Sequence, residues 1–311
     1  MNLSDIPSDH INVLISKSLL NSYCKKYRKD LKKYLNTGNP EALHQLRVYS
    51  RRLIAVLDFF SDQLPPKNIK VWKSEIKRFL NSLNQPRDIQ VQIDYIEHLA
   101  ENTNECINIS SEIVRFLRKL GTKQEKRVLN SLLKIRKSEF LLEIPEFCKN
   151  GNIIAHELLS PSNRKIVGSF CKQKIKPILL KFTRFRNLLY DPLKIAELHQ
   201  CRICMKNIRY SLEILNPFFS SIGKQLKIAM DLQSILGEIH DCDVWIDFLN
   251  GFSDNLTILK IKKAEFSILR KELKYLMTIR QSERETKHRH LLKLLNKYNH
   301  DVFEKQILNT F

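Results

Sequence analysis

Apolar residues recur at intervals of three and four along most of the chain, the spacing that places them on one face of an α-helix. In the first half this pattern predicts helices over about residues 9–35, 39–61 and 67–84, from residue 89 onward, and over about 109–120 and 123–149. Gly38 suits the C-cap of the first helix, and Asn39 and Pro40 suit the N-cap and first position of the second. Pro86 is expected to separate the third helix from the fourth.

The second half follows the same plan after a predicted break at Asn150-Gly151. Helices are predicted over about residues 163–190 and 193–215, from 217 to a boundary marked by Gly237 and residues 240–243, and over the tail from about 256. The 7 glycines and 10 prolines are too few for the frequent turns of sandwiches and barrels or for glycine-rich loops. The predicted fold class is therefore all-α.

A sequence motif occurs once in each half. Leu-His-Gln-Leu-Arg-Val at 43–48 recurs as Leu-His-Gln-Cys-Arg-Ile at 198–203. Downstream, residues 83–91 align with residues 236–244, and upstream Lys25 and Arg28 align with Lys181 and Arg184. Three matches in one order and one register indicate an internal duplication rather than chance. Two similar helical halves are expected, residues 1–151 and 152–311.

Each copy of the duplicated helix carries cations on one face and apolar residues on the opposite face. At about 100° per residue, His44, Arg47 and Arg51 share one side. The second copy has a single stripe, formed by His199, Arg202, Lys206 and Arg209. Like charges at these spacings destabilise a helix by about 0.2–0.5 kcal/mol per pair, and a solvated face normally interleaves glutamates. The recurrence of this costly pattern favours a polyanion-binding surface over a merely solvated one.

The overall charge points to the same class of partner. Fifty-three Lys and Arg against 33 Asp and Glu leave a net charge of +20, more than solubility requires. Nucleic acid, anionic lipid or a phosphate polymer would suit such a field. No apolar stretch approaches the ~20 residues of a membrane span, and the N-terminus lacks a signal-peptide pattern. The seven scattered cysteines do not suggest a disulfide framework, so a cytoplasmic location with reduced cysteines is expected.

The motif His-x-x-Arg-Val/Ile-x-x-Arg/Lys, followed about forty residues later by an Arg-Asp-x-x-Val-type segment and duplicated, resembles the CHAD family, the conserved-histidine α-helical domain. The resemblance spans essentially the whole chain. It implies one domain of two four-helix bundles, packed about a pseudo-twofold axis, with a basic central pore that binds inorganic polyphosphate. The implied binding residues are His44, Arg47, Arg51 and Arg52 in the first half and His199, Arg202, Lys206 and Arg209 in the second. Lys25, Arg28, Lys181 and Arg184, on the preceding helix of each half, are further candidates.

The two copies are not identical. Ile54 stands where the second copy has Arg209, and Asn207 stands where the first has Arg52. In the downstream segment His240 replaces the arginine. These departures predict an asymmetric site, with the downstream segments serving as structural turns.

Other chemical motifs are interpreted as structural. Glu283-Arg284-Glu285-Thr286-Lys287 matches the Glu-x-Glu-x-Lys signature of triphosphate-tunnel hydrolases, often fused to CHAD modules. That signature belongs on a barrel strand, whereas here it lies in a helical pattern where i and i+2 diverge. Cys201 and Cys204 lack further zinc ligands and lie on an apolar face. The segment at 240–243 is interpreted as an N-capping turn, and His288 and His290 as solvated residues that do not converge. No metal or cofactor is expected.

The hypothesis from the sequence is a cytoplasmic polyphosphate-binding protein, with association with polyphosphate granules left open. Binding is favoured over catalysis, because no carboxylates align with the basic stripes to recruit Mg²⁺. Asp58 and Glu213 lie near the far ends of the two helices and share the basic side only if the helical wheel holds over four turns. One alternative is a protein that binds RNA or another nucleic acid, although it lacks the known motifs. Its Phe59-Phe60 and Phe218-Phe219 pairs suit a core better than stacked bases. The other alternative is an accessory subunit or enzyme of polyphosphate or triphosphate metabolism.

Overall fold

The computed structural model describes residues 10–103, 105–149, 161–256, 263–298 and 300–311, and all regular secondary structure among them is helical. The helices of the first half are α1 (Ile11–Thr37), α2 (Pro40–Phe59), the 3₁₀ turn η2 (Ser61–Gln63), α3 (Pro66–Asn102), α4 (Ile107–Ile135) and α5 (Glu139–Phe147). Those of the second half are α6 (Pro161–Arg186), η3 (Asn187–Tyr190), α7 (Ile195–Leu215), η4 (Ser220–Ile222), α8 (Gly223–Leu256), α9 (Lys263–Lys297) and α10 (His300–Thr310). None of the described helices is both long and apolar enough to cross a membrane.

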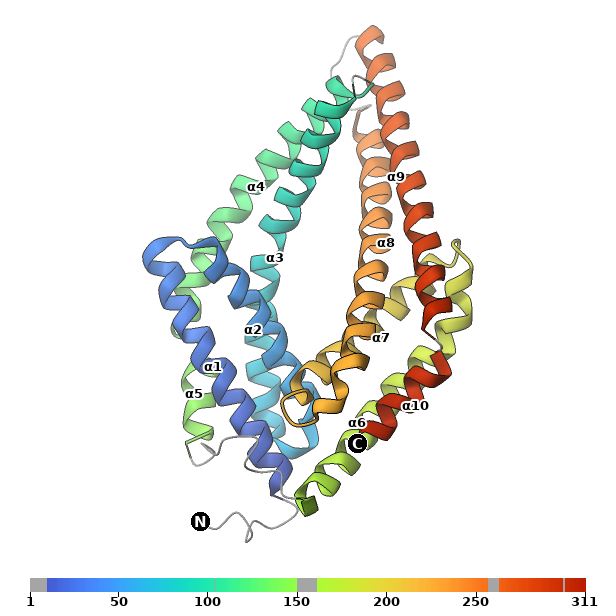
Figure 1. Ribbon diagram of the computed structural model, residues 1–311. Coiled ribbons are helices and arrows are strands. Elements are labelled where there is room, and N and C mark those ends of the chain that lie inside the picture. Colours follow the sequence, from blue (N-terminus) through green and yellow to red (C-terminus); the bar gives the residue numbers. More distant parts are fainter. Residues whose placement is uncertain (1–9, 104, 150–160, 257–262, 299) are drawn as a thin grey trace.

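The helices form two arms that are joined at both ends (Figure 1). The helices that carry the repeated motif, α2 and α7, pack against each other at the base. Two long hairpins, α3–α4 and α8–α9, extend from this base and converge at their far ends, where α4 contacts α9. The base and the far end therefore fix the positions of the two arms relative to each other.

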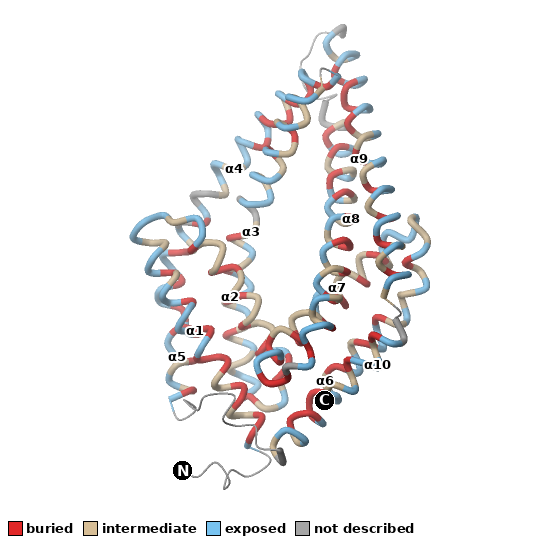
Figure 2. Tube along the Cα trace, in the orientation of Figure 1, coloured by how far each residue is buried: buried red, intermediate tan, exposed pale blue. Residues whose placement is uncertain are grey.

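Two apolar clusters hold this arrangement. The larger cluster, at the base, contains buried residues of both halves, among them Leu53 of α2 and Ile208 of α7. The smaller cluster, at the far end, is built from α3, α4, α8 and α9, with Ile113 and Trp245 as members. Figure 2 shows buried positions recurring along the helices, with exposed positions between them. The two halves share both cores, because each half supplies part of every cluster.

A carboxylate reinforces the far end. Glu272 of α9 is buried, and its two oxygens accept hydrogen bonds from the first turn of α4. The Ile109 backbone N–H donates over 2.7 Å, and Asn108 Nδ2 donates over 2.7 Å. A negative charge at a helix N-terminus satisfies unpaired N–H groups and complements the helix dipole. This contact ties the first arm to the second.

The predicted start of α2 and end of α1 are confirmed. Gly38 adopts the left-handed conformation with φ 64°, which a residue without a Cβ tolerates, and its N–H bonds the Tyr34 carbonyl. The Asn39 side chain accepts a hydrogen bond of 2.9 Å from the backbone N–H of Ala42. Pro40 occupies the first helical position, where no N–H is required.

Three predicted boundaries are wrong, because single helices run through them. The helix α3 is continuous from Pro66 to Asn102, α4 continues through Gly121, and α8 continues through Gly237 and residues 240–243. A helical glycine costs only about 1 kcal/mol, which packing along a long hairpin can offset. A Cβ added to Gly237 would have no atom within 4 Å, so no close packing requires glycine at this position of the helix. The predicted break at Asn150-Gly151 lies outside the described residues.

Replacing Leu53 by alanine tests the shared core. Leu53 is fully buried at the base, and such truncations cost about 2–5 kcal/mol through lost transfer energy and the cavity left behind. Leu133→Ala on α4 is the matched control, since its side chain is 55% exposed and its loss should change stability by less than about 0.5 kcal/mol. Urea unfolding monitored by circular dichroism should show a lower midpoint for Leu53→Ala alone. Equal midpoints for the two variants would contradict the assignment of the core.

Candidate functional site

A cleft of about 740 Å³ lies where α2, α3, α6 and α7 converge. Its lining contains six cations and two carboxylates: Arg51, Lys77, Arg87, Lys174, Arg202 and Lys206, with Asp58 and Asp88. These residues come from both halves of the chain. The cleft is therefore a local concentration of positive charge, built from residues distant in the sequence.

On the first side, Arg47 and Arg51 are held by α3. Arg47 is buried, and its Nη1 donates to the Leu83 carbonyl oxygen over 3.4 Å. Arg51 Nη2 lies 3.5 Å from Asn84 Oδ1 at the edge of the cleft. Burial, together with repulsion from Arg87 and Arg51, lowers the pKa of Arg47. An anion placed here would relieve that repulsion.

On the second side, Arg202 and Lys206 project from α7 into the same cleft. Desolvation, and then repulsion from Arg51 and Arg202, lowers the pKa of the Lys206 ammonium. The Nε atoms of Arg47 and Arg202 are both buried and have no hydrogen-bond partner among the described residues. Arg47 and Arg202 occupy equivalent positions of the sequence repeat. Each side of the site thus has an arginine with a buried Nε–H that no described residue accepts.

Two other predicted site residues, Arg52 and Arg209, are compensated by one carboxylate. Arg209 Nε lies 2.8 Å from Glu213 Oε1, and Arg52 Nε lies 3.8 Å from Glu213 Oε2. The pair Arg52–Glu213 also links α2 to α7. The expectation that no carboxylate aligns with the basic stripes is therefore wrong for Glu213. Of the eight motif residues, these two are already paired within the protein.

The histidines of the motif differ in their contacts. His44 is half-buried, whereas His199 contacts His240 of α8, with their Nδ1 atoms 3.2 Å apart and their rings 4.5 Å apart. The prediction that residues 240–243 form an N-capping turn is wrong, because they lie within α8. The pKa of His240 is lowered from 6.5, first by desolvation and then by the charges of Arg202 and His199.

The four candidates on the preceding helices lie elsewhere. Lys25, Arg28, Lys181 and Arg184 are exposed on α1 and α6, and none belongs to the lining of the cleft. Arg28 donates to the Leu141 carbonyl oxygen of α5, beside a separate hollow of about 300 Å³. Of the predicted site residues, Arg51, Arg202 and Lys206 therefore line the cleft, whereas the four candidates on α1 and α6 do not.

Residues 19–250 match the family model of the CHAD domain. The chain belongs to the CHAD domain family. Its fold resembles the crystal structure of the CHAD domain from the plant Ricinus communis, with a TM-score of 0.59 at 19% identity, covering 96% of this chain and 91% of that one. It also resembles PptA from Streptomyces chartreusis, with a TM-score of 0.60 at 13% identity, covering 90% and 98%. No curated protein matches the chain.

The cleft between α2, α3, α6 and α7 of this CHAD domain also contains residues that the sequence did not indicate. Lys77 of α3, Lys174 of α6 and Tyr210 of α7 lie in the lining, and no motif identified them. Arg87 and Asp88 belong to the repeated downstream segment, which was expected to be a structural turn. Because α3 continues through this segment, Arg87 and Asp88 reach the cleft from a helix. The sequence repeat, which includes Arg87 and Asp88, could have identified these two residues as site candidates.

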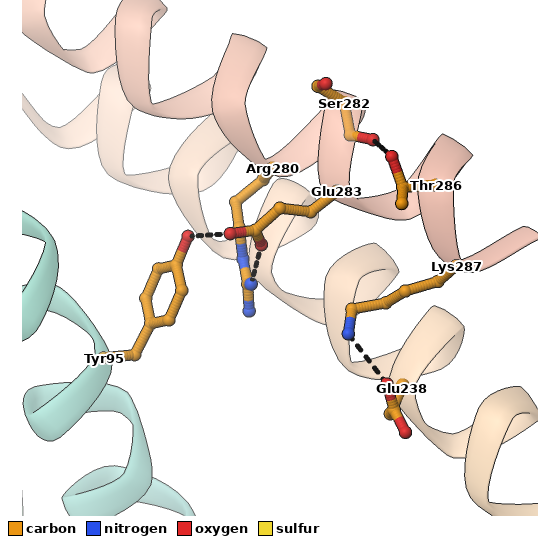
Figure 3. Close-up of polar contacts among 7 residues, drawn as sticks. All are labelled: Tyr95, Glu238, Arg280, Ser282, Glu283, Thr286 and Lys287. Atoms are coloured by element: carbon orange, nitrogen blue, oxygen red, sulfur yellow. Dashed lines mark hydrogen bonds and ion pairs between the residues drawn. The ribbon is translucent and has the colours of Figure 1, made fainter. Parts of the chain in front are cut away.

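The Glu-x-Glu-x-Lys segment of this CHAD domain lies within α9, as predicted, and joins the arms (Figure 3). Glu283 accepts hydrogen bonds from the Tyr95 hydroxyl of α3, over 3.1 Å, and from Arg280. Lys287 donates to Glu238 of α8 over 2.8 Å. The Arg280 guanidinium lies 3.9 Å from the centre of the Tyr95 ring, a cation–π contact. Glu283 and Arg280 therefore support the contact between the arms, whereas Lys287 joins the two helices of the α8–α9 hairpin.

The remaining candidate ligands are also engaged in packing. Cys201 and Cys204 are buried, as predicted, and burial raises the pKa of the Cys201 thiol to about 12. His288 is buried, so its expected solvated position is wrong; its Nε2 donates to the Leu189 carbonyl oxygen over 2.9 Å. His290 is exposed. Among the described residues, no group of three or more His, Cys, Asp or Glu side chains could hold a metal ion.

The lowered pKa of His240 predicts a pH-dependent stability. The unfolded chain binds this proton more readily than the folded CHAD domain, so stability is lost as pH falls below about 6.5 towards the folded-state value. Carboxylates also titrate on acidification, and the difference between wild type and His240→Asn isolates the histidine. Melting temperatures measured between about pH 8 and pH 5 should fall less steeply for the variant. Parallel curves would show that His240 is not held neutral in the unliganded protein.

Proposed function

We propose that this CHAD domain binds inorganic polyphosphate in the cleft between α2, α3, α6 and α7. The observation that carries the proposal is the convergence of six cations with only two carboxylates in one hollow. One of these cations, Lys174, is paired with Asp62 of η2, whereas the other five have no ion pair within the part of the chain that the structure describes. A polymer with a negative charge on every unit can engage several such cations at once.

The side chains present suit phosphate oxygens. Arginine donates planar, bidentate hydrogen bonds to phosphate, and lysine adds a compact positive charge. Arg51 and Arg202 would bind the polyphosphate from opposite sides. Lys206 would bind it between them, and Lys77 and Arg87 would bind it along α3. Arg202, which lines the cleft, also has an Nε–H without a protein partner among the described residues. Phosphate would then stabilise a cluster of charges that otherwise repel one another.

The internal duplication suggests how the proposed site is arranged between the two halves. We infer that the two halves are related by a pseudo-twofold axis and that the cleft forms part of a basic groove between them. The groove would be asymmetric, because Glu213 neutralises cations of both halves at one end and His240 replaces an arginine at the other. Single-stranded nucleic acid is a poorer match, because base stacking needs repeated exposed aromatic platforms. The lining has two aromatic residues, Phe59, which is buried in the core, and Tyr210, which is half-buried.

Neutralising Arg51 and Lys206 tests the site. A charge-assisted hydrogen bond is worth about 1.5–3 kcal/mol, so Arg51→Gln and Lys206→Gln should each weaken polyphosphate binding at least about tenfold. The double variant should lose more than either single one. Each lost phosphate contact should also reduce the dependence of log K on log salt, by about 0.7–0.9 if the polymer behaves like nucleic acid. Calorimetric titrations at several salt concentrations measure both quantities.

The control is Lys271→Gln with Lys274→Gln, which removes the same charge from exposed positions of α9. Equal losses for the control and for the double variant in the cleft would mean that diffuse charge, not a defined site, attracts the polymer. Competition by RNA of equal total charge is the second arm. If RNA displaces polyphosphate at lower concentration than polyphosphate displaces RNA, the ligand is a nucleic acid.

A further inference from the structure

The His199–His240 contact joins the second copy of the motif helix to the downstream segment of the same half. Both rings are half-buried, and their Nδ1 atoms are 3.2 Å apart. An N–H···N hydrogen bond needs one nitrogen as donor and the other as acceptor, so the pair cannot carry a proton on both Nδ1 atoms in this arrangement. The unliganded geometry therefore selects a neutral or singly protonated pair.

The charges around the pair come from several helices. From α7, Arg202 and His199 act on His240, and both disfavour its protonation. From α8 itself, Asp241 and Asp243 favour protonation. Asp243 is engaged by Arg284 of α9, and Lys287 of α9 pairs with Glu238 of α8.

The pair is coupled to the cleft on two sides. Arg202, one turn after His199, lines the cleft and repels a proton on His240. Asp241 follows His240 in α8. Desolvation, together with repulsion from Asp241, raises the pKa of Asp88 of α3, and Asp88 also lines the cleft. A polyanion bound at Arg202 would offset the repulsion that now disfavours the imidazolium form.

The sequence repeat shows which residue of the first half corresponds to His240. In the alignment of the two downstream segments, His240 stands where the first half has Arg87. Arginine is permanently charged, whereas histidine changes its charge near neutral pH. The positive charge is therefore fixed at the first copy of this position and adjustable at the second.

We propose that the His199–His240 pair links anion binding to proton uptake, so that this domain holds a phosphate polymer more tightly as pH falls. The inference rests on the proposed function, since the cleft must bind a polyanion. Ligand in the cleft draws a proton onto the pair, and by reciprocity the proton strengthens ligand binding by the same factor. If binding raises the proton affinity of the pair tenfold, affinity rises about tenfold between the high-pH and low-pH limits.

Two substitutions at one position test this linkage. His240→Arg restores the permanent charge of the first copy, and His240→Asn removes the titrating ring but keeps a polar side chain. Polyphosphate of defined length would be titrated calorimetrically between about pH 5.5 and pH 8, in buffers with different ionisation enthalpies, to count the protons taken up. His98→Asn is the control, because His98 is exposed on α3 and lies outside the lining of the cleft.

Wild type and His98→Asn should take up protons on binding and gain about tenfold in affinity on acidification. His240→Arg should bind as tightly at high pH as wild type does at low pH, and His240→Asn should stay weak throughout. Terminal phosphates of the ligand also titrate, but they contribute equally to every variant. Identical pH slopes for wild type, His240→Arg and His240→Asn would overturn the linkage while leaving polyphosphate binding intact. Absence of binding to wild type at every pH would instead overturn the proposed function, and the linkage with it.

A measurement on the unsubstituted protein guards against misfolded variants. The histidine ring resonances would be followed by NMR through a pH titration, with and without saturating polyphosphate. The titration midpoints of His199 and His240 should move to higher pH in the complex, while that of His98 stays unchanged. Unchanged midpoints for the pair would reject the proposal.

Discussion

The packing of α2 against α7 is the constraint on which the rest of the site depends. Both helices carry cations on one face, and their contact brings Arg51, Arg202 and Lys206 to a single cleft. These like charges repel, and the pKa values of Arg47 and Lys206 are lowered first by desolvation and then by the neighbouring cations. Burial of apolar side chains such as Leu53 and Ile208 on the opposite faces offsets that repulsion. A strong shared core therefore permits a strained charge distribution.

The two long hairpins keep this base from separating. At the far end, Glu272 caps α4, and the Arg280 guanidinium contacts the aromatic rings of both Tyr95 and Trp245. Glu283 then bonds both Arg280 and Tyr95. Because the arms are joined at the base and at the far end, the cations of α3 are held in place opposite those of α7. Preorganisation of this kind reduces the entropy that binding of any ligand in the cleft would cost.

Charge in the site is divided into three kinds. Glu213 compensates Arg52 and Arg209, which then serve to hold α2 to α7. Arg51, Arg202 and Lys206 face the cleft, where a ligand can reach them. His199 and His240 form a third kind, two half-buried histidines in contact with each other beside Arg202. Residues of one sequence motif therefore occupy three different electrostatic environments.

The sequence by itself determined the all-α class, the family and the motif residues, because helical periodicity and a duplicated motif are local patterns along the chain. It also located the cap at Asn39, where the side chain bonds a backbone group three residues away. The sequence misplaced the boundaries at residues 86–88 and 240–243, since a hairpin partner can sustain a helix through proline or glycine. Only the tertiary structure showed that Glu213 neutralises Arg52 and Arg209, that Lys77 and Lys174 enter the cleft, and that His240 meets His199. Those contacts join residues far apart in the chain, and their distances follow from how whole helices pack rather than from any spacing within one helix.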